Sequence, residues 1–501
     1  MDRSRGALAT FSLAIALTGA PGLVRSALAQ SADLVVEPFL LRGFDGVETP
    51  AELGRLTVPA DRADSAGGTI ELAFVRLPST AGRPGSPIVF LAGGPGVPGI
   101  VMGQVPPYRS LFERLRAHAD VILLDQRGTG RSTPNLDCPS DASLPVDVLL
   151  DEERGLAALL RPLEACAARL RAEGVEPADY TTAASADDIE DLREALGAER
   201  VSLLGFSYGT ELVLAYVRRH PETADRLVLA AVRPPWSVVK LPSTYDRTIE
   251  ALSEIAARDS DAEIADFADA LRRSLDRLET EPMALTVADG RSGVPVELRV
   301  GKPGLQAVLQ GAIADGRRMP AAVAMVAALD RGEPEPFRRE IEKLYNGLGG
   351  GIGMMGVAMN CSAGWSAERR ARATDEARTA LLGGTPNLML APEACVIAGN
   401  PDLGPGYREP VVSDRPALFL SGALDPNAPP AQAEEALAGF RNGMHVVVEN
   451  GSHETLPATE VQSLVVDFLG GADVTGRGVS LPPPDFPTPA GILAPPGGPA
   501  P

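Results

Sequence analysis

One short segment of the chain dictates a strand, a tight turn and a helix, in that order. Gly205 to Gly209 read Gly-Phe-Ser-Tyr-Gly, with an apolar run from Val201 to Leu204 before them and a helical pattern from Thr210 to Arg219 after them. In so tight a turn, a side chain two positions before or after the serine would collide with the backbone, which explains Gly205 and Gly209. The turn lifts the hydroxyl of Ser207 above the edge of a sheet. The five-residue pattern alone occurs by chance in many chains, but this context predicts a reactive serine.

A reactive serine needs a base, and a histidine is expected after it in the chain, behind an acid. The chain has four histidines. His118 precedes an apolar run, His220 ends the helix after the serine, and His445 lies inside a strand pattern at 444–448. His453 instead lies in the loop after that strand, where its ring could reach over the sheet edge. We therefore predict His453 as the base.

The predicted acid is Asp425, which follows the strand pattern from Ala417 to Gly422 and precedes a proline. Its carboxylate would orient the ring of His453 and stabilise the imidazolium that forms when Ser207 loses its proton. Each residue alone has an ordinary explanation, Asp425 as a turn residue and His453 as a surface loop histidine. Their occurrence in the expected order favours a catalytic triad.

Two backbone N–H groups are also expected to stabilise the oxyanion that forms when a serine attacks a carbonyl. One should come from Tyr208, directly after the serine. The other should come from the loop after the strand pattern at 88–91, which reads Gly-Gly-Pro-Gly at 93–96. We predict Gly94 as this donor, with Gly93 as the second choice. Without the serine turn, Gly-Gly-Pro-Gly would indicate an ordinary surface turn.

A third motif lies between the glycine loop and the serine turn, where Asp125 to Ser132 read Asp-Gln-Arg-Gly-Thr-Gly-Arg-Ser. Together with the loop at 93–96 and the turn around Ser207, it resembles the prolyl aminopeptidase and tripeptidyl aminopeptidase branch of the α/β-hydrolases. Residues 54–59 add to the similarity, and residues 416–457 resemble the C-terminal domain of the secreted tripeptidyl aminopeptidases. One departure is Ala92, where the family commonly has a histidine, and it bears on loop geometry and substrate preference.

The resemblance implies an α/β fold of the α/β-hydrolase type, with a mostly parallel sheet, flanking helices and an inserted, mainly helical cap. It implies a serine hydrolase without cofactor, an aminopeptidase of the prolyl or tripeptidyl type that releases residues from the free N-terminus of peptides through an acyl-enzyme. A carboxylesterase with the same triad is the alternative, and a catalytically inactive binding protein is a third reading. An epoxide hydrolase or dehalogenase is disfavoured because those enzymes place an aspartate where this chain has Ser207.

The resemblance also raises the question of which acidic residue would bind the ammonium group of a peptide substrate. Glu211 lies one helical turn after Ser207 and is a weak candidate. A carboxylate that pairs within the core or faces solvent is the more common explanation for such a residue.

The pattern along the chain supports this organisation. Short apolar runs alternate with helical patterns from about 34 to 232, as in a largely parallel sheet. The alternation fades between 234 and 409, where most of the sequence looks helical, and returns at Ala417. One helix is predicted well, from the capping-box pair Ser185 and Asp188 to Gly197. The expected divisions are a core part at 30–233, a helical cap at 234–410, a second core part at 411–470, and a disordered tail rich in Pro and Gly at 471–501.

Residues 1–29 are predicted to be a signal peptide, with two basic residues at the start, an apolar stretch at 7–20 and Ala27-Leu28-Ala29 before Gln30. The apolar stretch is short for a membrane anchor and is broken by Pro21-Gly22. We expect a soluble protein exported to the periplasm or the medium. A net charge of −20 argues against nucleic acid or an anionic membrane as partner. The predicted triad and the resemblance instead imply a peptide or ester substrate.

Export changes how the four cysteines are interpreted, because an even number in an oxidising compartment suggests disulfides. Three connectivities are possible, and free buried thiols are the alternative. We favour Cys138 with Cys166 and Cys361 with Cys395, since each pair is local and the second resembles a pair in the tripeptidyl aminopeptidase group. No metal site is predicted, because the sequence contains neither Cys-x-x-Cys nor His-Glu-x-x-His.

Overall fold

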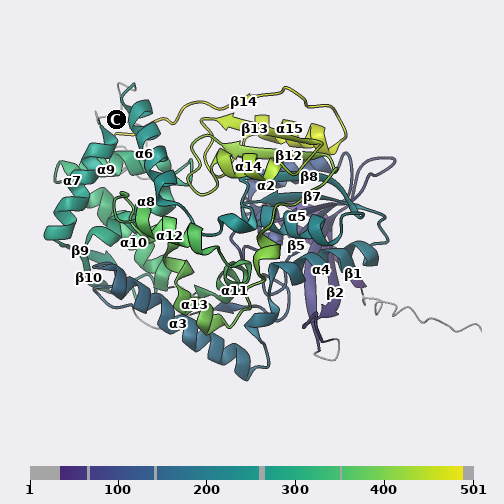
Figure 1. Ribbon diagram of the computed structural model, residues 1–501, viewed down its shortest axis with the longest axis horizontal. Helices are drawn as coiled ribbons and strands as arrows, with labels where there is room; N and C mark the ends of the chain where they lie inside the picture. The colour runs from purple at the N-terminus through teal and green to yellow at the C-terminus, as the bar shows by residue number, and fades with distance from the viewer. Residues whose placement is uncertain (1–33, 65–67, 140–143, 259–265, 350–351, 489–501) are drawn as a thin grey trace, which may run out of the picture.

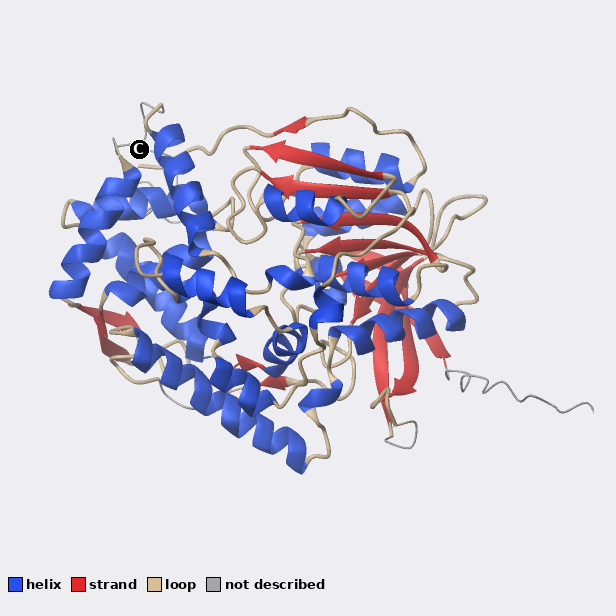
Figure 2. Ribbon diagram, viewed as in Figure 1, coloured by secondary structure: helices blue, strands red, loops and turns tan. Residues whose placement is uncertain are grey.

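The computed structural model describes residues 34–64, 68–139, 144–258, 266–349 and 352–488. The predicted signal peptide at 1–29 lies outside these residues. Within them, a twisted sheet with its covering helices lies beside a second, mainly helical body (Figures 1 and 2). None of the helices in the described part of the chain combines the length and the apolar character that crossing a bilayer would require.

Ten strands form the large sheet, in the order β1-β2-β3-β5-β4-β7-β8-β12-β13-β14. Their bounds are β1 (Leu34–Arg42), β2 (Glu48–Pro59), β3 (Thr69–Leu77), β4 (Ile88–Leu91), β5 (Val121–Asp125), β7 (Val201–Phe206), β8 (Ala224–Ala230), β12 (Ala417–Gly422), β13 (Gly443–Glu449) and β14 (Val479–Ser480). The pairs from β1 to β5 are antiparallel, and every pair from β5 to β14 is parallel. The sheet is therefore mostly parallel, and the fold class predicted from the sequence is confirmed.

Helices cover both faces of the sheet. One face packs against α1 (Gly99–Gln104), α2 (Pro106–Leu115) and α15 (Thr459–Leu469), and the other against α4 (Thr182–Ala195), α5 (Tyr208–Arg219) and α14 (Pro430–Leu437). Along β4, Ile88 and Phe90 belong to the first of these cores, whereas Val89 and Leu91 belong to the second. A strand buried on both faces needs a continuous apolar run, which explains the sequence of β4.

The start of α4 differs from its prediction. We expected Ser185 and Asp188 to form a capping box, but the helix begins at Thr182, where the side chain of Thr181 accepts a hydrogen bond from the N–H of Ala184 at 3.1 Å. Ser185 is buried inside the helix. Both threonine and serine can cap a helix, so the sequence offered two starts, and the preceding chain selects the earlier one.

Between β8 and β12 the chain forms the second body, which we call the cap. Its helices are α6 (Pro242–Ala256), α7 (Phe267–Thr280), α8 (Lys302–Ile313), α9 (Met319–Asp330), α10 (Glu335–Gly349), α11 (Met354–Ala363), α12 (Ala367–Glu376) and α13 (Pro392–Ala398), with 3₁₀ turns η2 (Pro235–Ser237), η3 (Thr385–Leu390) and η4 (Pro405–Arg408). An antiparallel hairpin of β9 (Met283–Ala288) and β10 (Pro295–Val300), which the sequence pattern did not indicate, lies at its edge (Figure 2).

An earlier segment of the chain also belongs to the cap. Val148 and Leu149 share a hydrophobic core with side chains of the cap helices, and α3 (Glu152–Ala172) follows them. The short strand β6 (Asp137–Cys138) pairs with β11 (Ile352–Gly353). The cap is thus built from two segments of the chain, not from the insertion at 234–410 alone.

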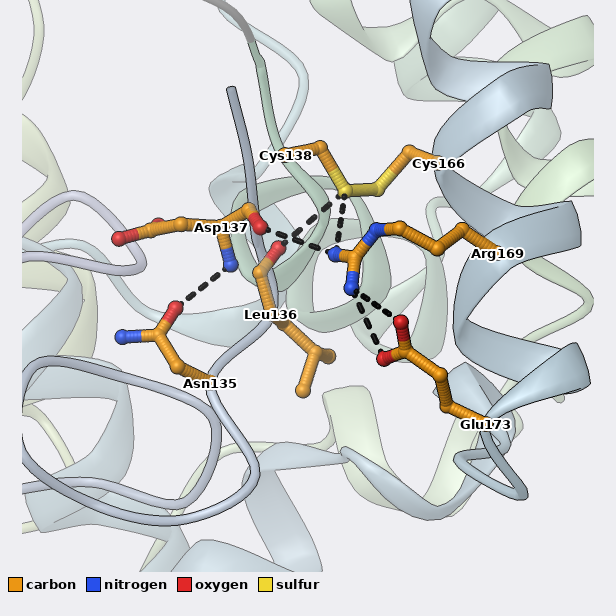
Figure 3. Close-up of a disulfide and its surroundings, with 7 residues drawn as sticks. All are labelled: Asn135, Leu136, Asp137, Cys138, Cys166, Arg169 and Glu173. Atoms are coloured by element: carbon orange, nitrogen blue, oxygen red, sulfur yellow. Dashed lines mark hydrogen bonds and ion pairs between the residues drawn. A yellow bond between two sulfur atoms is a disulfide. The ribbon is translucent and has the colours of Figure 1, made fainter.

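Each of the two segments of the cap contains one disulfide, and the two disulfides are the pairs that we expected. Cys138 is bonded to Cys166 of α3, with Cα atoms 5.5 Å apart, and Cys361 of α11 is bonded to Cys395 of α13, with Cα atoms 5.4 Å apart. Beside the first disulfide, Arg169 pairs with Glu173 at 2.8 Å (Figure 3). Each bond joins an α-helix to a neighbouring element of the same body.

The tail differs from the disorder that we expected for residues 471–501. As far as residue 488 it is placed along the protein: β14 extends the sheet beside β13, Val474 is buried in the sheet core, and Phe486 is buried in the cap core. These apolar side chains supply burial that the Pro and Gly content alone did not predict, and proline is tolerated at a sheet edge. Residues 489–501 lie outside the described part of the chain.

Candidate active site

The turn between β7 and α5 places Ser207 at the carboxyl edge of the sheet. Ser207 has φ 53° and ψ −118°, a conformation that is rare for a residue with a side chain. A Cβ atom on Gly205 would lie 2.6 Å from the carbonyl oxygen of Gly209, and one on Gly209 would lie 2.0 Å from the carbonyl oxygen of Leu91. Both glycines are therefore required by close packing of the turn, as the sequence indicated.

Asp425 and His453 lie at the same edge, after β12 and β13. The Nε2 atom of His453 lies 3.0 Å from Oγ of Ser207, and its Nδ1 atom lies 2.8 Å from Oδ2 of Asp425. The other carboxylate oxygen of Asp425 accepts hydrogen bonds from the N–H groups of Asn427 and Ala428, at 2.8 and 3.0 Å. The three residues proposed from the sequence thus form a continuous chain of hydrogen bonds.

The charge state of Asp425 suits a partner for an imidazolium. Burial opposes its ionisation, but His453 and the backbone hydrogen bond from Ala428 outweigh this effect and lower the pKa of the carboxyl below its ordinary value. The loop that carries His453 is held from the cap side, because its N–H donates to the carbonyl of Ala314 at the end of α8, at 3.3 Å. The cap and the core therefore meet at the histidine.

The glycine loop after β4 lies directly beside Ser207. A Cβ atom on Gly93 would lie 3.1 Å from Cβ of Ser207. Gly94 lines the same cavity as Ser207. Its φ is 108°, a backbone conformation that only glycine adopts without strain. The glycine loop and Ser207, which directly precedes α5, therefore border the same cavity.

Asp125, the first residue of the motif at 125–132, holds the chain that follows the glycine loop. Its two carboxylate oxygens accept hydrogen bonds from the N–H groups of Ile100 and Arg131, at 2.9 and 2.8 Å, and Ser132 donates to its carbonyl at 2.7 Å. Burial raises the pKa of Asp125 to about 6, against the effect of these donors. The sequence marked this motif as diagnostic of the family without giving it a role, and the structure shows a scaffold between β5 and the start of α1.

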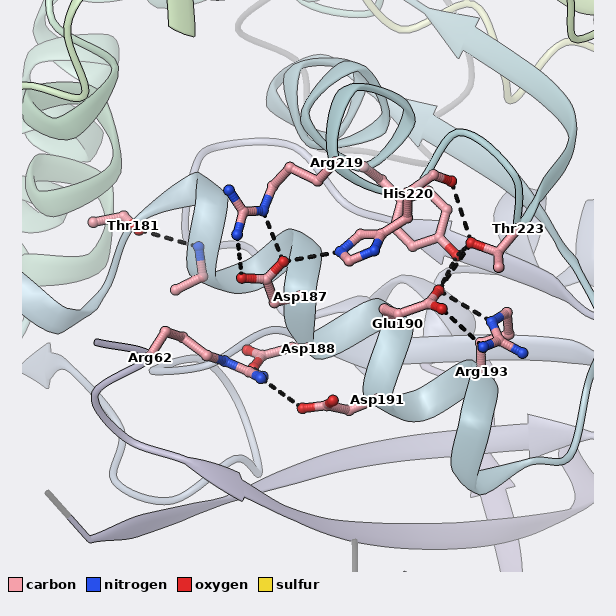
Figure 4. A network of polar contacts seen from close by, with 12 residues as sticks. Arg62, Thr181, Asp187, Asp188, Glu190, Asp191, Arg193, Arg219, His220 and Thr223 are labelled. Carbon is pink, nitrogen blue, oxygen red and sulfur yellow. Dashed lines mark hydrogen bonds and ion pairs between the residues drawn. The ribbon is translucent and has the colours of Figure 1, made fainter. Parts of the chain in front are cut away.

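Arg127 of the same motif is fully buried and holds α4 in place. Its guanidinium forms two hydrogen bonds of 2.7 Å with Asp188 and donates to the carbonyls of Ala60 and Asp179. Figure 4 shows Asp188 beside Arg62, which also pairs with Asp191 at 2.7 Å. This explains Asp188, which the sequence had suggested as a helix cap.

Two of the other three histidines, His220 and His445, have polar partners away from Ser207. His220 lies at the end of α5, with Nε2 2.9 Å from Asp187, in the network that Figure 4 shows. His445 lies in β13, with Nε2 3.0 Å from the hydroxyl of Ser421. Neither is among the residues that line the cavity at Ser207.

Glu211, the weak candidate for binding a substrate ammonium, is fully buried behind the site. Its carboxylate pairs with Arg233 at 2.9 Å and accepts a hydrogen bond from the hydroxyl of Tyr407 at 2.8 Å. Burial raises the pKa of this carboxyl, although Arg233 opposes the shift. The structure thus supports the alternative given for Glu211, a carboxylate that pairs within the core.

Ser207 and His453 open onto a cavity of about 580 Å³ between the core and the cap. Its polar wall includes Arg233, Lys240, Gln310 and Asn360, which come from the cap side of the cavity. Sequence analysis missed these four residues, because each is a single polar residue in a stretch without a recognisable motif. No group of three or more His, Cys, Asp and Glu side chains that could hold a metal occurs among the described residues.

Comparison with known families agrees with this geometry. Residues 86–304 match the family model described as "alpha/beta hydrolase fold", and residues 384–480 match the one described as "TAP-like protein". The fold and the matched regions define the class of the protein as an α/β-hydrolase. The chain combines an α/β-hydrolase region with a TAP-like C-terminal region, and proteins named tripeptidyl aminopeptidase and proline iminopeptidase are among the relatives that it resembles.

Curated relatives match mainly one part of the chain. It is 30% identical over 190 residues to the serine protease Hip1 of Mycobacterium tuberculosis, covering 36% of each chain, and 29% identical over 197 residues to the tripeptidyl aminopeptidase of Streptomyces coelicolor, covering 37% of this chain and 36% of the other. It is 32% identical over 153 residues to the "Probable proline iminopeptidase" of Leptolyngbya boryana, covering 30% and 33%. These alignments span about a third of the relatives' length. Among solved structures, a thermophilic esterase from Thermogutta terrifontis aligns at 18% identity over 83% of this chain and 97% of its own, with a TM-score of 0.36.

Proposed function

We propose that the protein is a serine hydrolase in which Ser207 is the nucleophile, His453 the general base and acid, and Asp425 the residue that orients the imidazole. The observation that carries the proposal is the chain of hydrogen bonds from Oγ of Ser207 through His453 to Asp425, at 3.0 and 2.8 Å. Both distances lie within the range that proton transfer requires.

The reaction then follows from the geometry. Oγ of Ser207 attacks the substrate carbonyl carbon while Nε2 of His453 takes the hydroxyl proton. The tetrahedral oxyanion accepts hydrogen bonds from the N–H of Tyr208 and from that of Gly94, with Gly93 as the second choice. Support for these donors is the position of Tyr208 at the N-terminus of α5 and the contact of the glycine loop with Ser207. His453 returns the proton to the leaving group, and water activated by the same histidine releases the acyl group.

We propose an aminopeptidase of the prolyl or tripeptidyl type as the activity, acting on the free N-terminus of peptides. Three named relatives support it, as a protease, a tripeptidyl aminopeptidase and an iminopeptidase. The cap, which forms one wall of the cavity, would limit the length of chain that enters. A carboxylesterase with the same triad is the second candidate, because ester hydrolysis needs no further group.

We also propose that the protein is exported, with residues 1–29 as the signal peptide. Two disulfides support this location, because such bonds persist in oxidising compartments. A purified exported form that starts at Gln30, read by N-terminal mass spectrometry, would agree with the proposal. A protein retained in the cytoplasm with residues 1–29 intact would contradict it.

The experiment that separates the two activities compares matched leaving groups. The protein is assayed with peptide p-nitroanilides whose N-terminus is free or acetylated, and with a p-nitrophenyl ester, alongside Ser207→Ala. We expect cleavage of the free peptide anilides, little cleavage of the acetylated ones, and no activity in Ser207→Ala. Cleavage of the ester alone would replace the aminopeptidase with the carboxylesterase.

A further inference from the structure

The cavity above Ser207 has an unusual distribution of charge for a site that receives a free N-terminus. Among the described residues that line it, Arg233 and Lys240 are cationic, Gln310, Asn360 and Asn427 are amides, and none is Asp or Glu. An ammonium group bound there would find cations and amides but no lining carboxylate. The lining instead suits an anionic group on the substrate.

Two carboxylates that interact electrostatically with Lys240, those of Glu211 and Asp425, are already engaged with other partners. Glu211 is fully buried and pairs with Arg233, which also donates to Oδ1 of Asn360 at 2.8 Å. Asp425 is bound to His453 and to two backbone N–H groups. The charge of Arg233 is therefore compensated by Glu211, and neither carboxylate is available to a ligand.

Lys240 differs from Arg233 in its partners. Its Nζ donates to the backbone carbonyl of Asn427 at 2.8 Å, and the described residues place no carboxylate within ion-pair distance of it. The backbone N–H and carbonyl of Lys240 form two hydrogen bonds of 2.8 Å with the side chain of Asn387, which hold the backbone of this residue in place. The ammonium group of a lysine has three N–H donors. Because the carbonyl of Asn427 accepts from one of them, donors of Lys240 remain for a ligand.

Burial disfavours the charged form of Lys240 unless an anion lies beside it. Burial, with the repulsion of Arg233 second, lowers the pKa of Lys240 to about 7. A carboxylate that enters the cavity would restore the charged form and form a charge-assisted hydrogen bond, which is stronger away from bulk water. A bound ammonium would have the opposite effect on the same lysine.

We propose that Lys240 is a specificity-determining residue that binds a carboxylate of the substrate. The inference deepens the proposed function and rests on it, since it concerns the substrate that Ser207 attacks. The carboxylate has two possible sources in a peptide, the side chain of an Asp or Glu residue near the scissile bond or the free C-terminal carboxylate of a short peptide. In either case the amine of the substrate lies away from Lys240.

The test compares peptides that differ only in this charge. One set of N-terminally free hexapeptides carries Asp, Asn, Glu or Gln at each position in turn, and a second set pairs a free C-terminus with an amidated one. Cleavage is followed by mass spectrometry with wild type, Lys240→Met, Lys240→Arg and Ser207→Ala. The first set detects an acidic side chain as the source, and the second detects the C-terminus.

We expect wild type to favour the carboxylate member of one set by about 10- to 100-fold in kcat/KM, which is the range of a hydrogen bond to a charged group. Lys240→Met should remove this preference by raising KM for the carboxylate peptides more than for the amide peptides. Lys240→Arg should retain part of the preference. The matched control is Lys343→Met on α10, whose exposed side chain pairs with Glu340 and lies outside the cavity, and it should leave the preference intact.

Two results would overturn the proposal. One is a wild-type protein that cleaves carboxylate and amide peptides equally in both sets. The other is a Lys240→Met protein that loses kcat equally for charged and uncharged substrates, which would make Lys240 a support for the loop at Asn427. If Lys240→Met does not fold, the wild-type comparison and Lys240→Arg still decide between these results.

An ester pair keeps this test separate from the aminopeptidase proposal. If no peptide is cleaved, the same question is asked with p-nitrophenyl hydrogen succinate and p-nitrophenyl pentanoate, which differ in a carboxylate at the end of the acyl chain. A preference for the succinate ester that Lys240→Met abolishes would support the role of Lys240 while the peptidase activity fails. Equal rates for the two esters would overturn the role of Lys240.

Discussion

Ser207 owes the position of its hydroxyl at the cavity to a backbone conformation that few residues adopt. The φ of 53° is maintained because Gly205 and Gly209 let β7, α5 and the end of β4 approach one another closely. The same approach brings the Gly93 loop against the serine. The position of the nucleophile therefore distinguishes this serine from an ordinary one, and the carboxylate of Asp425 orients the imidazole that would activate it.

The first prediction at this scale concerns Asp425. Replacing it by Asn should lower kcat by about 10³- to 10⁴-fold, because an amide favours the wrong tautomer of His453 and does not stabilise the imidazolium. Circular dichroism should show an unchanged fold, since Asn retains an acceptor for the N–H groups of Asn427 and Ala428. A variant within tenfold of wild-type kcat would argue against the role of this residue.

The second prediction concerns Asp125, whose folded pKa of about 6 lies above the ordinary value for a carboxyl. A raised carboxyl pKa means that the folded state prefers the protonated form, so the stabilising contribution is complete below pH about 4 and is lost as the pH rises through 6. Asp125→Asn is uncharged at every pH but leaves one N–H donor unpaired, so it should be less stable than wild type in acid. The difference between the free energies of unfolding of wild type and Asp125→Asn should therefore decrease by about 2 kcal/mol between pH 4.5 and pH 7.5.

Denaturant unfolding of wild type and Asp125→Asn at several pH values measures this difference directly. The comparison cancels most groups that titrate in both proteins. A difference in the free energy of unfolding that increases with rising pH would contradict the raised pKa of Asp125.

At the scale of elements, the parallel strands could be predicted because each is a short apolar run buried on both faces, as in β4 and β7. The turn around Ser207 and the positions of Asp425 and His453 could be predicted because each lies at the end of a strand pattern that the sequence shows clearly. The hairpin of β9 and β10 was missed because its strands have one exposed face and lie among helical patterns. The start of α4 was misplaced because Thr181 and Ser185 are both suitable caps, and only tertiary packing distinguishes them.

The cap wall shows a different limit of sequence reasoning. Gln310 lies on α8 and Asn360 on α11, whereas Arg233 and Lys240 lie in the loops before and after η2. No spacing in the sequence connects the four residues. Their common property is a shared cavity, which depends on how the cap helices pack on the core. Glu211 could be assigned a pairing role only after Arg233 and Tyr407 were placed beside it.

A prediction at this scale concerns the disulfide between Cys138 and Cys166. Replacing both residues by Ser should lower the free energy of unfolding by about 3 to 4 kcal/mol in the chain-entropy model for a loop of 28 residues. Thermal unfolding with and without a reductant measures the effect, and the double variant should respond to the reductant only through the second disulfide. Equal melting temperatures for wild type and the double variant would show that the bond does not constrain the cap.

At the scale of the whole molecule, the cap is assembled from segments that are distant in the sequence. Val148 comes before β7 in the chain, the helices α6 to α10 come after β8, and Phe486 comes from the tail. Side chains from all three segments nevertheless share one hydrophobic core. The tail first adds β14 to the sheet and then reaches the cap, so one segment of chain contacts both bodies. The position of the cap over Ser207 thus depends on contacts from the segment at Val148 and from the tail, as well as from the insertion after β8.

The prediction that belongs to this scale is the effect of Phe486→Ala. Truncating an almost fully buried ring should lower the free energy of unfolding by about 3 to 5 kcal/mol, if the tail and the cap unfold with the rest of the molecule. Denaturant unfolding followed by fluorescence measures this loss, with Val447→Ala, at an exposed position on β13, as the control. An unchanged midpoint would show that the tail is not part of the cooperative unit.

Covalent labelling of Ser207 tests the central claim most directly. Wild type, Ser207→Ala and His453→Ala are treated with a fluorophosphonate, and the adduct is located by mass spectrometry. We predict one adduct, on Ser207, in wild type, none in Ser207→Ala, and labelling slowed by at least about 10³-fold in His453→Ala. A folded wild-type protein that is not labelled, or equal labelling of Ser207→Ala, would contradict the assignment of Ser207 as a nucleophile activated by His453.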